Sequence, residues 1–379
     1  FAGNLLEGYD FISLAEISRR PTDGRAPGAL DQGDWVENDN ECYAGSLAED
    51  SSWHGTHVAG TIAEATNNGV GMAGVAHKST ILPVRVLGKC GGTLADISDA
   101  IIWASGGTVE GVPANQNPAE VINLSLGGSG ACGAAYQDAI NGAVSRGTLV
   151  VVAAGNSAGN AANFRPASCN NVVAVGANRI TGGIASYSNY GPVVDLSGPG
   201  GGGGVDGNPN GYVWQAISGG LTTPTSGTFT YGGMAGTSMA APHVAGVAAL
   251  VQSALADAGR DTLSPADLEA LLKQTARQFP VTIPTGTPIG SGIVDAKAAL
   301  DKALEVPCDP DVEECAPDAT PLTNRVVLGG QSGSAGSETL YSFEAEAGAA
   351  ISILTYGGRG NVSLYVGEGE EPDATSYAA

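Results

Sequence analysis

The sequence predicts an α/β domain in which helices cover both faces of a parallel sheet. Four apolar runs, at 80–86, 121–125, 149–153 and 172–175, alternate with helical stretches along the chain. Strands that are apolar throughout are buried on both faces, and helical connections make neighbouring strands parallel. The composition agrees, because 42% hydrophobic and 14% charged residues are typical of a globular chain. In such sheets the active site lies at the carboxyl ends of the strands.

The helices are predicted from small apolar residues at helical spacing and from their start signals. They are expected at 94–104, 134–145, 239–256, 265–275 and 295–304. Ser264 followed by Pro265 is a strong signal for the start of one of them. The glycine-rich stretch 198–211 and the polar segment 218–233 do not lead directly into a helix, so surface loops explain them better than a phosphate-binding role.

The composition changes after residue 304. Residues 305–321 are acidic and contain proline and cysteine, as expected of a linker. Short β-type runs separated by glycine turns fill 322–379 and predict a small β-sandwich. About four strands fit into this stretch, fewer than sandwiches usually have, so we expect a partial one. The predicted divisions are therefore 1–304, 305–321 and 322–379.

The charge of the chain restricts its partners. Lys and Arg total 16 against 38 Asp and Glu, a net charge of −22. A surface this acidic repels phosphate backbones, so we expect no nucleic-acid partner. No apolar run is expected to span a membrane, and no signal peptide opens the chain. We expect a monomer.

The six cysteines form an even set without a C-x-x-C pair, which predicts disulfides rather than a zinc site. Their order suggests one of 15 possible pairings: Cys42 with Cys90, Cys132 with Cys169, and Cys308 with Cys315. Disulfides persist in oxidising compartments, so the protein is expected to be secreted.

A serine, Ser238, stands at the mouth of the predicted helix that begins near Met239. A helix N-terminus and the serine's own backbone N–H can stabilise a negative charge, which suits a nucleophile. The alternative is an ordinary N-cap serine.

Two further motifs supply the other parts of acyl-transfer chemistry. His54 and His57 stand at the start of a small-residue helix, and a hydroxyl nucleophile needs such a base. Spacing does not choose between them, and a histidine there can equally be a core residue. Asn156 follows the apolar run 149–153, where its amide can donate to an oxyanion or simply form a turn.

Four motifs in this order resemble the subtilisin-like serine peptidases, or subtilases, over about residues 1–304. They are His-Gly-Thr-His-Val-Ala-Gly at 54–60, Asn-Leu-Ser-Leu-Gly-Gly at 123–128, Ala-Ala-Gly-Asn-Ser at 153–157 and Gly-Thr-Ser-Met-Ala-Ala-Pro-His at 236–243. The resemblance implies a subtilisin-like fold and an extracellular endopeptidase. It makes Ser238 the nucleophile, His54 the base and Asn156 an oxyanion donor. It also implies that polypeptide substrates contact Ser125, Leu126, Gly127 and Gly155.

The family's Asp-Thr/Ser-Gly motif does not occur in this sequence. Gly-Tyr-Asp-Phe-Ile at 8–12 resembles a stretch that follows that motif, which places the aspartate partner of His54 before Phe1. Asp50 lies too close to His54 in sequence to replace it. Without an aspartate the rate should fall by about 10⁴, so a chain that starts at Phe1 is expected to be nearly inactive.

The resemblance also raises structural calcium as a cofactor. Asp23, Asp31 and Asp34 lie in a glycine-rich stretch and could ligate a hard cation, although a solvated acidic loop is the plainer interpretation. The segment 66–72 resembles a calcium loop of the family. Residues 322–379 resemble the pre-peptidase C-terminal domain of secreted bacterial peptidases, through Leu-Tyr-Ser-Phe at 340–343 and Val-Ser-Leu-Tyr-Val at 362–366.

Two other functions remain open on the sequence. A subtilase fold could serve only for binding, although such a protein would not need His54, Asn156 and Ser238 together. An esterase could use the same serine and histidine, but the usual Gly-x-Ser-x-Gly lacks its second glycine at 236–240.

Overall fold

The computed structural model describes residues 3–305, 320–321 and 341–342. The chain divides into two compact units, Phe1–Glu305 and Val306–Ala379. In the second unit β12 (Thr320–Pro321) pairs in parallel with β13 (Tyr341–Ser342). The rest of the predicted linker and sandwich, and the predicted Cys308–Cys315 pair, lie outside the described residues.

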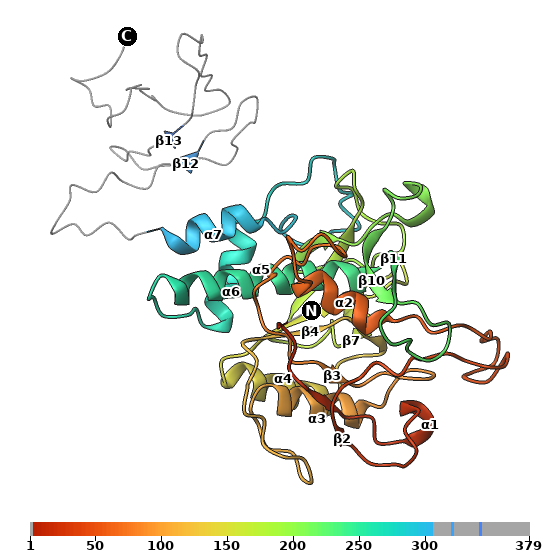
Figure 1. The fold of residues 1–379 in the computed structure, drawn as a ribbon. Coiled ribbons are helices and arrows are strands. Elements are labelled where there is room, and N and C mark those ends of the chain that lie inside the picture. The colour runs from red at the N-terminus through yellow and green to blue at the C-terminus, as the bar shows by residue number, and fades with distance from the viewer. Residues whose placement is uncertain (1–2, 306–319, 322–340, 343–379) are drawn as a thin grey trace, which may run out of the picture. The chain divides into compact units, whose positions relative to one another are not determined.

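A four-stranded parallel sheet forms the centre of the first unit (Figure 1). Its order is β4 (Val121–Leu124), β6 (Leu149–Ala153), β8 (Val173–Asn178) and β9 (Leu196–Pro199). Successive residues of β6 enter two different hydrophobic clusters, with Val150 and Val152 on one face and Leu149 and Val151 on the other. The unbroken apolar runs of the sequence therefore reflect burial on both faces, as predicted.

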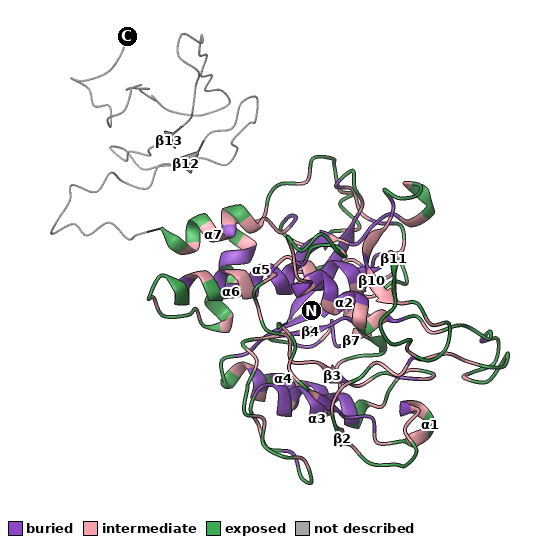
Figure 2. Ribbon diagram, in the orientation of Figure 1, coloured by how far each residue is buried: buried purple, intermediate pink, exposed green. Residues whose placement is uncertain are grey.

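Helices cover both faces of this sheet. On one face lie α3 (Leu94–Ala104) and α4 (Ala134–Ser145). On the other lie α5 (Thr237–Asp257) and α6 (Pro265–Gln274), with α2 (His54–Ala63) and α7 (Ala296–Leu304) packed against α5. Figure 2 shows α5 buried along most of its length, whereas α6 and α7 present exposed faces. These bounds agree closely with the predicted helices.

The expectation that no apolar run could span a membrane is wrong for α5 by length and composition. This helix is long and apolar enough, by length and composition, to cross a membrane, and 67% of its most apolar window is buried inside the unit. Its apolar character is explained by its place as the central core helix, between α2 and the sheet.

The predicted strand at 80–86 does not join the central sheet. Residues in its C-terminal half form β3 (Val84–Arg85), which pairs in parallel with β1 (Tyr9–Asp10). On its other side β1 pairs antiparallel with β2 (Ala26–Pro27). The short helix α1 (Ala15–Ser18) lies between β1 and β2 in the sequence. The expectation of one sheet holding all four runs is therefore wrong at this strand. Residues of both β3 and β4 line the same large cavity.

A second difference is a β-hairpin in the segment predicted as a loop. β10 (Val213–Ser218) pairs antiparallel with β11 (Phe229–Met234), and the short strands β5 (Gly128–Ser129) and β7 (Phe164–Arg165) form another antiparallel pair. Two glycines hide the strand pattern of β11. They are needed because side chains of β10 pack over them: a Cβ at Gly233 would lie 2.8 Å from the Trp214 ring.

Two disulfides, Cys42–Cys90 and Cys132–Cys169, join the predicted partners. The Cys132–Cys169 bond closes 37 residues of chain. Replacing both of these cysteines by alanine should lower the free energy of unfolding by about 4 kcal/mol, because the unfolded chain regains the entropy of that loop. Urea unfolding of the double variant beside the unmodified protein measures this. Equal midpoints in the two proteins would show that the bond adds no stability.

Candidate active site

The serine and asparagine motifs meet at the carboxyl ends of β4 and β6. These strands are parallel neighbours, so Ser125 after β4 and Asn156 after β6 reach the same edge of the sheet. Ser238 lies there as the second residue of α5. The Ser125 hydroxyl donates to the Ser238 carbonyl at 2.7 Å, and the Ser238 hydroxyl donates to the Ser125 carbonyl at 3.4 Å. Sequence segments more than 100 residues apart are thus joined at one point.

Asn156 is held by the residue before the serine. Both the backbone N–H and the hydroxyl of Thr237 donate to Asn156 Oδ1, at 2.8 and 2.9 Å. With Oδ1 occupied in this way, the Nδ2 donor has no partner among residues 3–305. The exposed amide can therefore donate to a substrate oxygen beside Ser238.

The serine hydroxyl is placed at the positive end of a long helix. Gly236 precedes α5 without a side-chain cap; the Thr237 N–H donates to Asn156 Oδ1 and the Met239 N–H to the Gly236 carbonyl, which leaves the Ser238 N–H without a partner among residues 3–305. Pro242 lies near the start of the helix and is buried with the alanines around it. This firm packing fixes the first turn, which carries Ser238.

His54 is the first residue of α2 and lines the same cavity as Ser125, Asn156 and Ser238, a cavity of about 2470 Å³. Burial is the main cause that lowers the pKa of His54 below 6.5, and nearby His57 lowers it further. The neutral imidazole, which can accept a proton, is thereby favoured. Within residues 3–305 no side chain hydrogen-bonds the ring, and the expected bond from Ser238 is not formed.

The other two histidines of the motifs are hydrogen-bonded to backbone carbonyls. His57 is 0% exposed, and its Nε2 lies 3.1 Å from the carbonyl oxygens of both Val213 and Gly232, to which it donates. His243 Nδ1 donates to the Met239 carbonyl at 2.8 Å. Burial lowers the pKa of both rings. Because His57 is buried and hydrogen-bonded whereas His54 lines the cavity, His54 is the better candidate for the general base; spacing in the sequence could not distinguish the two.

The residues predicted to contact substrate also line this cavity. Ser125, Leu126 and Gly127 follow β4 directly, and Gly155 lies across from them after β6. Gly155 has φ 105°, and a Cβ there would lie 2.3 Å from Asn189 Nδ2. Only glycine suits this position, which brings the backbone close to Asn189 and directs Asn156 toward the cleft.

The three predicted calcium ligands do not converge. Asp23 accepts a hydrogen bond from the Ala15 N–H, Asp34 from Ser52, and Asp31 from Thr56. Nowhere in the described part of the chain do three or more His, Cys, Asp or Glu side chains gather as a metal site. The residues present do not fit a bound calcium ion at this place.

Fold and side chains together define an α/β protein in which a serine, an asparagine and a histidine line one cavity at the edge of the sheet. The chain belongs to the subtilase family, whose model matches residues 19–355. It is 49% identical over 375 residues to the "Extracellular protease" of Xanthomonas campestris pv. campestris, a match that covers 99% of this chain and 60% of that protein. It is 48% identical to the "Extracellular basic protease" of Dichelobacter nodosus, over 80% of this chain and 48% of that protein.

The solved structures agree with the fold. The chain is similar to a structure of proteases from Pseudoalteromonas arctica PAMC 21717, with a TM-score of 0.74 and 52% identity. The match covers 79% of this chain and 84% of that one. The predicted subtilisin-like α/β fold is thus confirmed, while the chain spans less than two thirds of the length of the two curated relatives named above.

Proposed function

We propose that the protein is a secreted serine endopeptidase that cleaves polypeptides through an acyl-enzyme on Ser238. The observation that carries this proposal is the pair of bonds from Thr237 to Asn156 Oδ1, at 2.8 and 2.9 Å. They occupy Oδ1 and leave the amide N–H₂ free in the cavity that Ser238 also lines. A fixed amide donor of this kind can stabilise the oxyanion that acyl transfer forms.

The reaction follows from the groups at this edge of the sheet. Ser238 Oγ attacks the carbonyl carbon of the scissile bond while His54 takes its proton. The carbonyl oxygen becomes negative and accepts hydrogen bonds from Asn156 Nδ2 and the Ser238 N–H. His54 then gives the proton to the leaving amine, and a water molecule repeats the sequence to release the acyl group. An extended substrate would pair along Ser125–Gly127, as an added strand.

The location and the division of the chain are part of the same proposal. Two disulfides suit an oxidising compartment, and the names of both curated relatives call them extracellular. Residues 1–304 would be the peptidase domain, 305–321 a linker and 322–379 a pre-peptidase C-terminal domain. Calcium is left out of the proposal, because Asp23, Asp31 and Asp34 are directed to separate donors.

Cleavage of an internally quenched peptide, blocked at both ends, tests the proposal. We expect fluorescence to rise and mass spectrometry to find two fragments divided at one internal bond. A subtilase fold used only for binding would leave the peptide intact. An esterase would hydrolyse an ester analogue but not the peptide.

Replacing Asn156 by alanine should lower kcat by about 10²–10³, the loss known for the corresponding amide of subtilisin, the family's type enzyme. KM should change little, because the amide acts on the charge that develops in the transition state. Steady-state kinetics on the quenched peptide measures both constants. Asn210→Ala, at an exposed asparagine that does not line the cleft, is the control. An unchanged kcat in Asn156→Ala would contradict this role.

A further inference from the structure

The helix that begins with His54 has no ordinary N-cap. Its cap position is Trp53, which has φ 54° and makes no side-chain capping bond. Ser, Thr, Asp or Asn usually fills this position, because their oxygens accept from the first free N–H groups. The His54 N–H instead donates to Ser52 Oγ at 3.3 Å. The turn that carries His54 therefore depends on groups outside the helix.

Two carboxylates supply that support, one on each side of His54. Asp34 accepts from the Ser52 N–H at 2.7 Å and from the Ser52 hydroxyl at 2.6 Å. Asp31 Oδ2 accepts from the Thr56 hydroxyl at 2.8 Å. We call Asp31 and Asp34 the carboxylate bracket. Negative charges beside a helix N-terminus also stabilise the helix.

The bracket is held rigidly by the segment that contains it. Gly33, between the two aspartates, has φ 89°, and its N–H donates to Asp31 Oδ1 at 3.1 Å. A Cβ at Gly33 would lie 2.2 Å from the Thr222 carbonyl oxygen and 2.3 Å from Ser51 Oγ. The Asp34 N–H donates to the same Ser51 hydroxyl at 3.2 Å. The close approach of three chain segments thus fixes both carboxylates.

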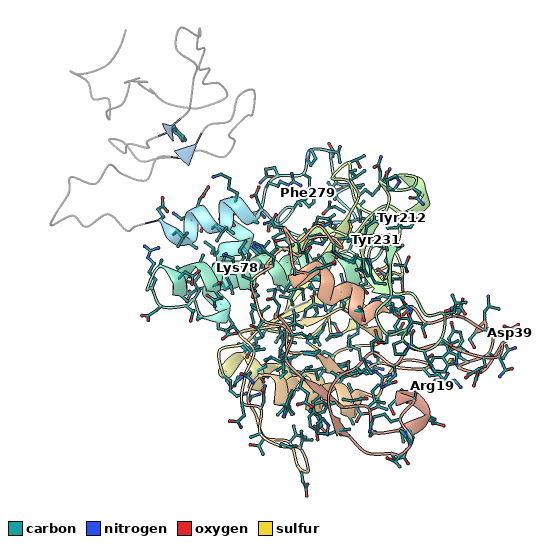
Figure 3. All side chains as sticks on the ribbon, in the orientation of Figure 1. Arg19, Asp39, Lys78, Tyr212, Tyr231 and Phe279 are labelled. Atoms are coloured by element: carbon teal, nitrogen blue, oxygen red, sulfur yellow. A yellow bond between two sulfur atoms is a disulfide. The ribbon has the colours of Figure 1, made fainter. Side chains whose placement is uncertain are left out.

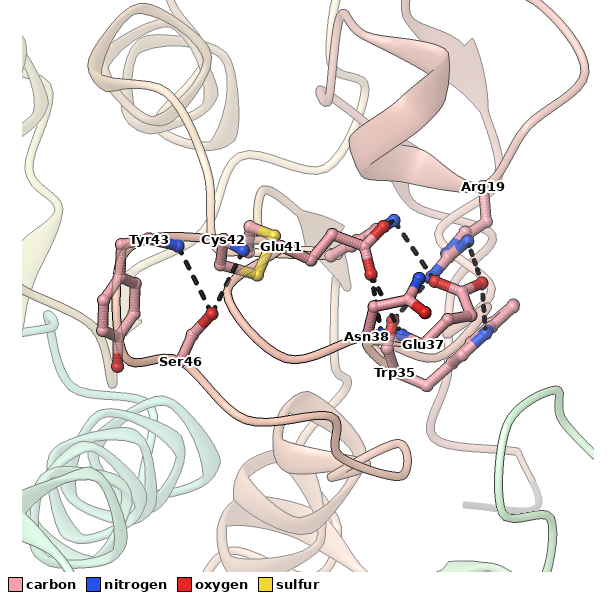
Figure 4. The surroundings of a disulfide bond; sticks show 10 residues. Arg19, Trp35, Glu37, Asn38, Glu41, Cys42, Tyr43 and Ser46 are labelled. Atoms are coloured by element: carbon pink, nitrogen blue, oxygen red, sulfur yellow. Dashed lines mark hydrogen bonds and ion pairs between the residues drawn. A yellow bond between two sulfur atoms is a disulfide. The ribbon is translucent and has the colours of Figure 1, made fainter.

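The far end of the segment is tied down as well (Figure 4). Arg19 donates to Glu37 Oε1 at 2.9 Å and lies 3.8 Å from the centre of the Trp35 ring, close to the Cys42–Cys90 disulfide. The hydrogen bond from Arg19 is the main cause that lowers the pKa of Glu37 to about 2. This support is present above pH 4.5 and is lost as the pH falls toward 2. Beyond it the segment projects to Asp39 (Figure 3).

The bracket also acts on the charge of His54. Burial and His57 disfavour the imidazolium form and lower the pKa of His54, whereas Asp34 and Asp31 favour that form and offset part of the lowering. Asp31 and Asp34 line the same cavity as His54. A general base must become positive during the reaction, so two fixed negative charges nearby lower the cost of that step.

We propose that Asp34 and Asp31 are positioning residues that fix the first turn of α2 and stabilise the charged form of its imidazole. The inference rests on the proposed role of His54 as the base. It concerns residues that the sequence pattern suggested as metal ligands. Because both aspartates act through Ser52 and Thr56, neither needs to touch the substrate.

The test is an NMR titration of the His54 ring in the inactive Ser238→Ala protein, which prevents self-digestion. Adding Asp34→Asn removes one negative charge, so the imidazolium is less stable and the pKa of His54 should fall by roughly 0.3 to 1 pH unit. Asp31→Asn should move it in the same direction. Asp50→Asn, an exposed aspartate close in sequence, is the matched control and should leave it unchanged.

Ser52→Ala separates position from charge. It removes the hydroxyl that links Asp34 to His54 but keeps both carboxylates, so kcat should fall while the pH of half-activity stays the same. The bracket is rejected if Asp34→Asn and Asp31→Asn leave the titration unchanged, or if Asp50→Asn shifts it equally. The titration needs no catalysis. Failure of the bracket therefore appears in the titration, and failure of the proposed function in peptide cleavage.

Discussion

In a protein that retains an aspartate partner for His54, replacing Ser238 by alanine should reduce kcat on a blocked peptide by about 10⁶, the loss measured when the nucleophile of subtilisin is removed. The physical reason is that no other hydroxyl takes its position: Ser125 directs its Oγ to the Ser238 carbonyl at 2.7 Å. KM should change little, because the extended substrate keeps its backbone contacts. Steady-state kinetics with long incubation measures the residual rate.

The control for this variant is Ser157→Ala. Ser157 is exposed and lines the same cavity, but it stands outside any helix N-terminus. Its removal should leave kcat within a factor of a few. A Ser238→Ala protein that retains more than about a hundredth of the activity would assign the nucleophile to another residue.

Replacing His54 by alanine should have an effect of similar size, about 10⁶ in kcat. Without the imidazole no neighbouring group can accept the serine proton, because His57 is fully buried and its Nε2 is used for two carbonyl oxygens. His77→Ala is the matched control, since His77 does not line the cleft.

The losses in kcat caused by the two substitutions should not be additive. Serine and imidazole act in one step, so the Ser238→Ala, His54→Ala double variant should be no slower than either single variant. A double variant slower by the product of both losses would show that the two residues serve separate functions.

The sequence predicted the buried elements most closely. The strand β6 (Leu149–Ala153) and the helices α3 and α4 begin and end as predicted, because their apolar residues repeat with the period of the element. The hairpin of β10 and β11 was missed. Its strands are half exposed, and the glycines that let Trp214 and Ile217 pack closely resemble loop glycines.

At the site, the sequence motifs identified the candidate residues but not their burial or their hydrogen-bond partners. Ser238, Asn156 and His54 stand out by motif, yet spacing alone left His54 and His57 equivalent until their burial was known. Asp31 and Asp34 were recognised as a cluster, but the sequence suggested calcium as their partner, whereas they accept hydrogen bonds from Ser52 and Thr56. Their hydrogen bonds to Ser52 and Thr56 depend on how the chain folds back, which no local pattern encodes.

The most direct test of the central claim is the site of modification by a fluorophosphonate, which reacts with an activated serine hydroxyl. Intact mass and peptide mapping of the labelled protein should show one adduct, on the peptide that contains Ser238. The His54→Ala protein should label far more slowly, and Ser238→Ala should not label. An adduct on any other residue, or equal labelling of the His54→Ala protein, would contradict the account of Ser238 as a nucleophile activated by His54.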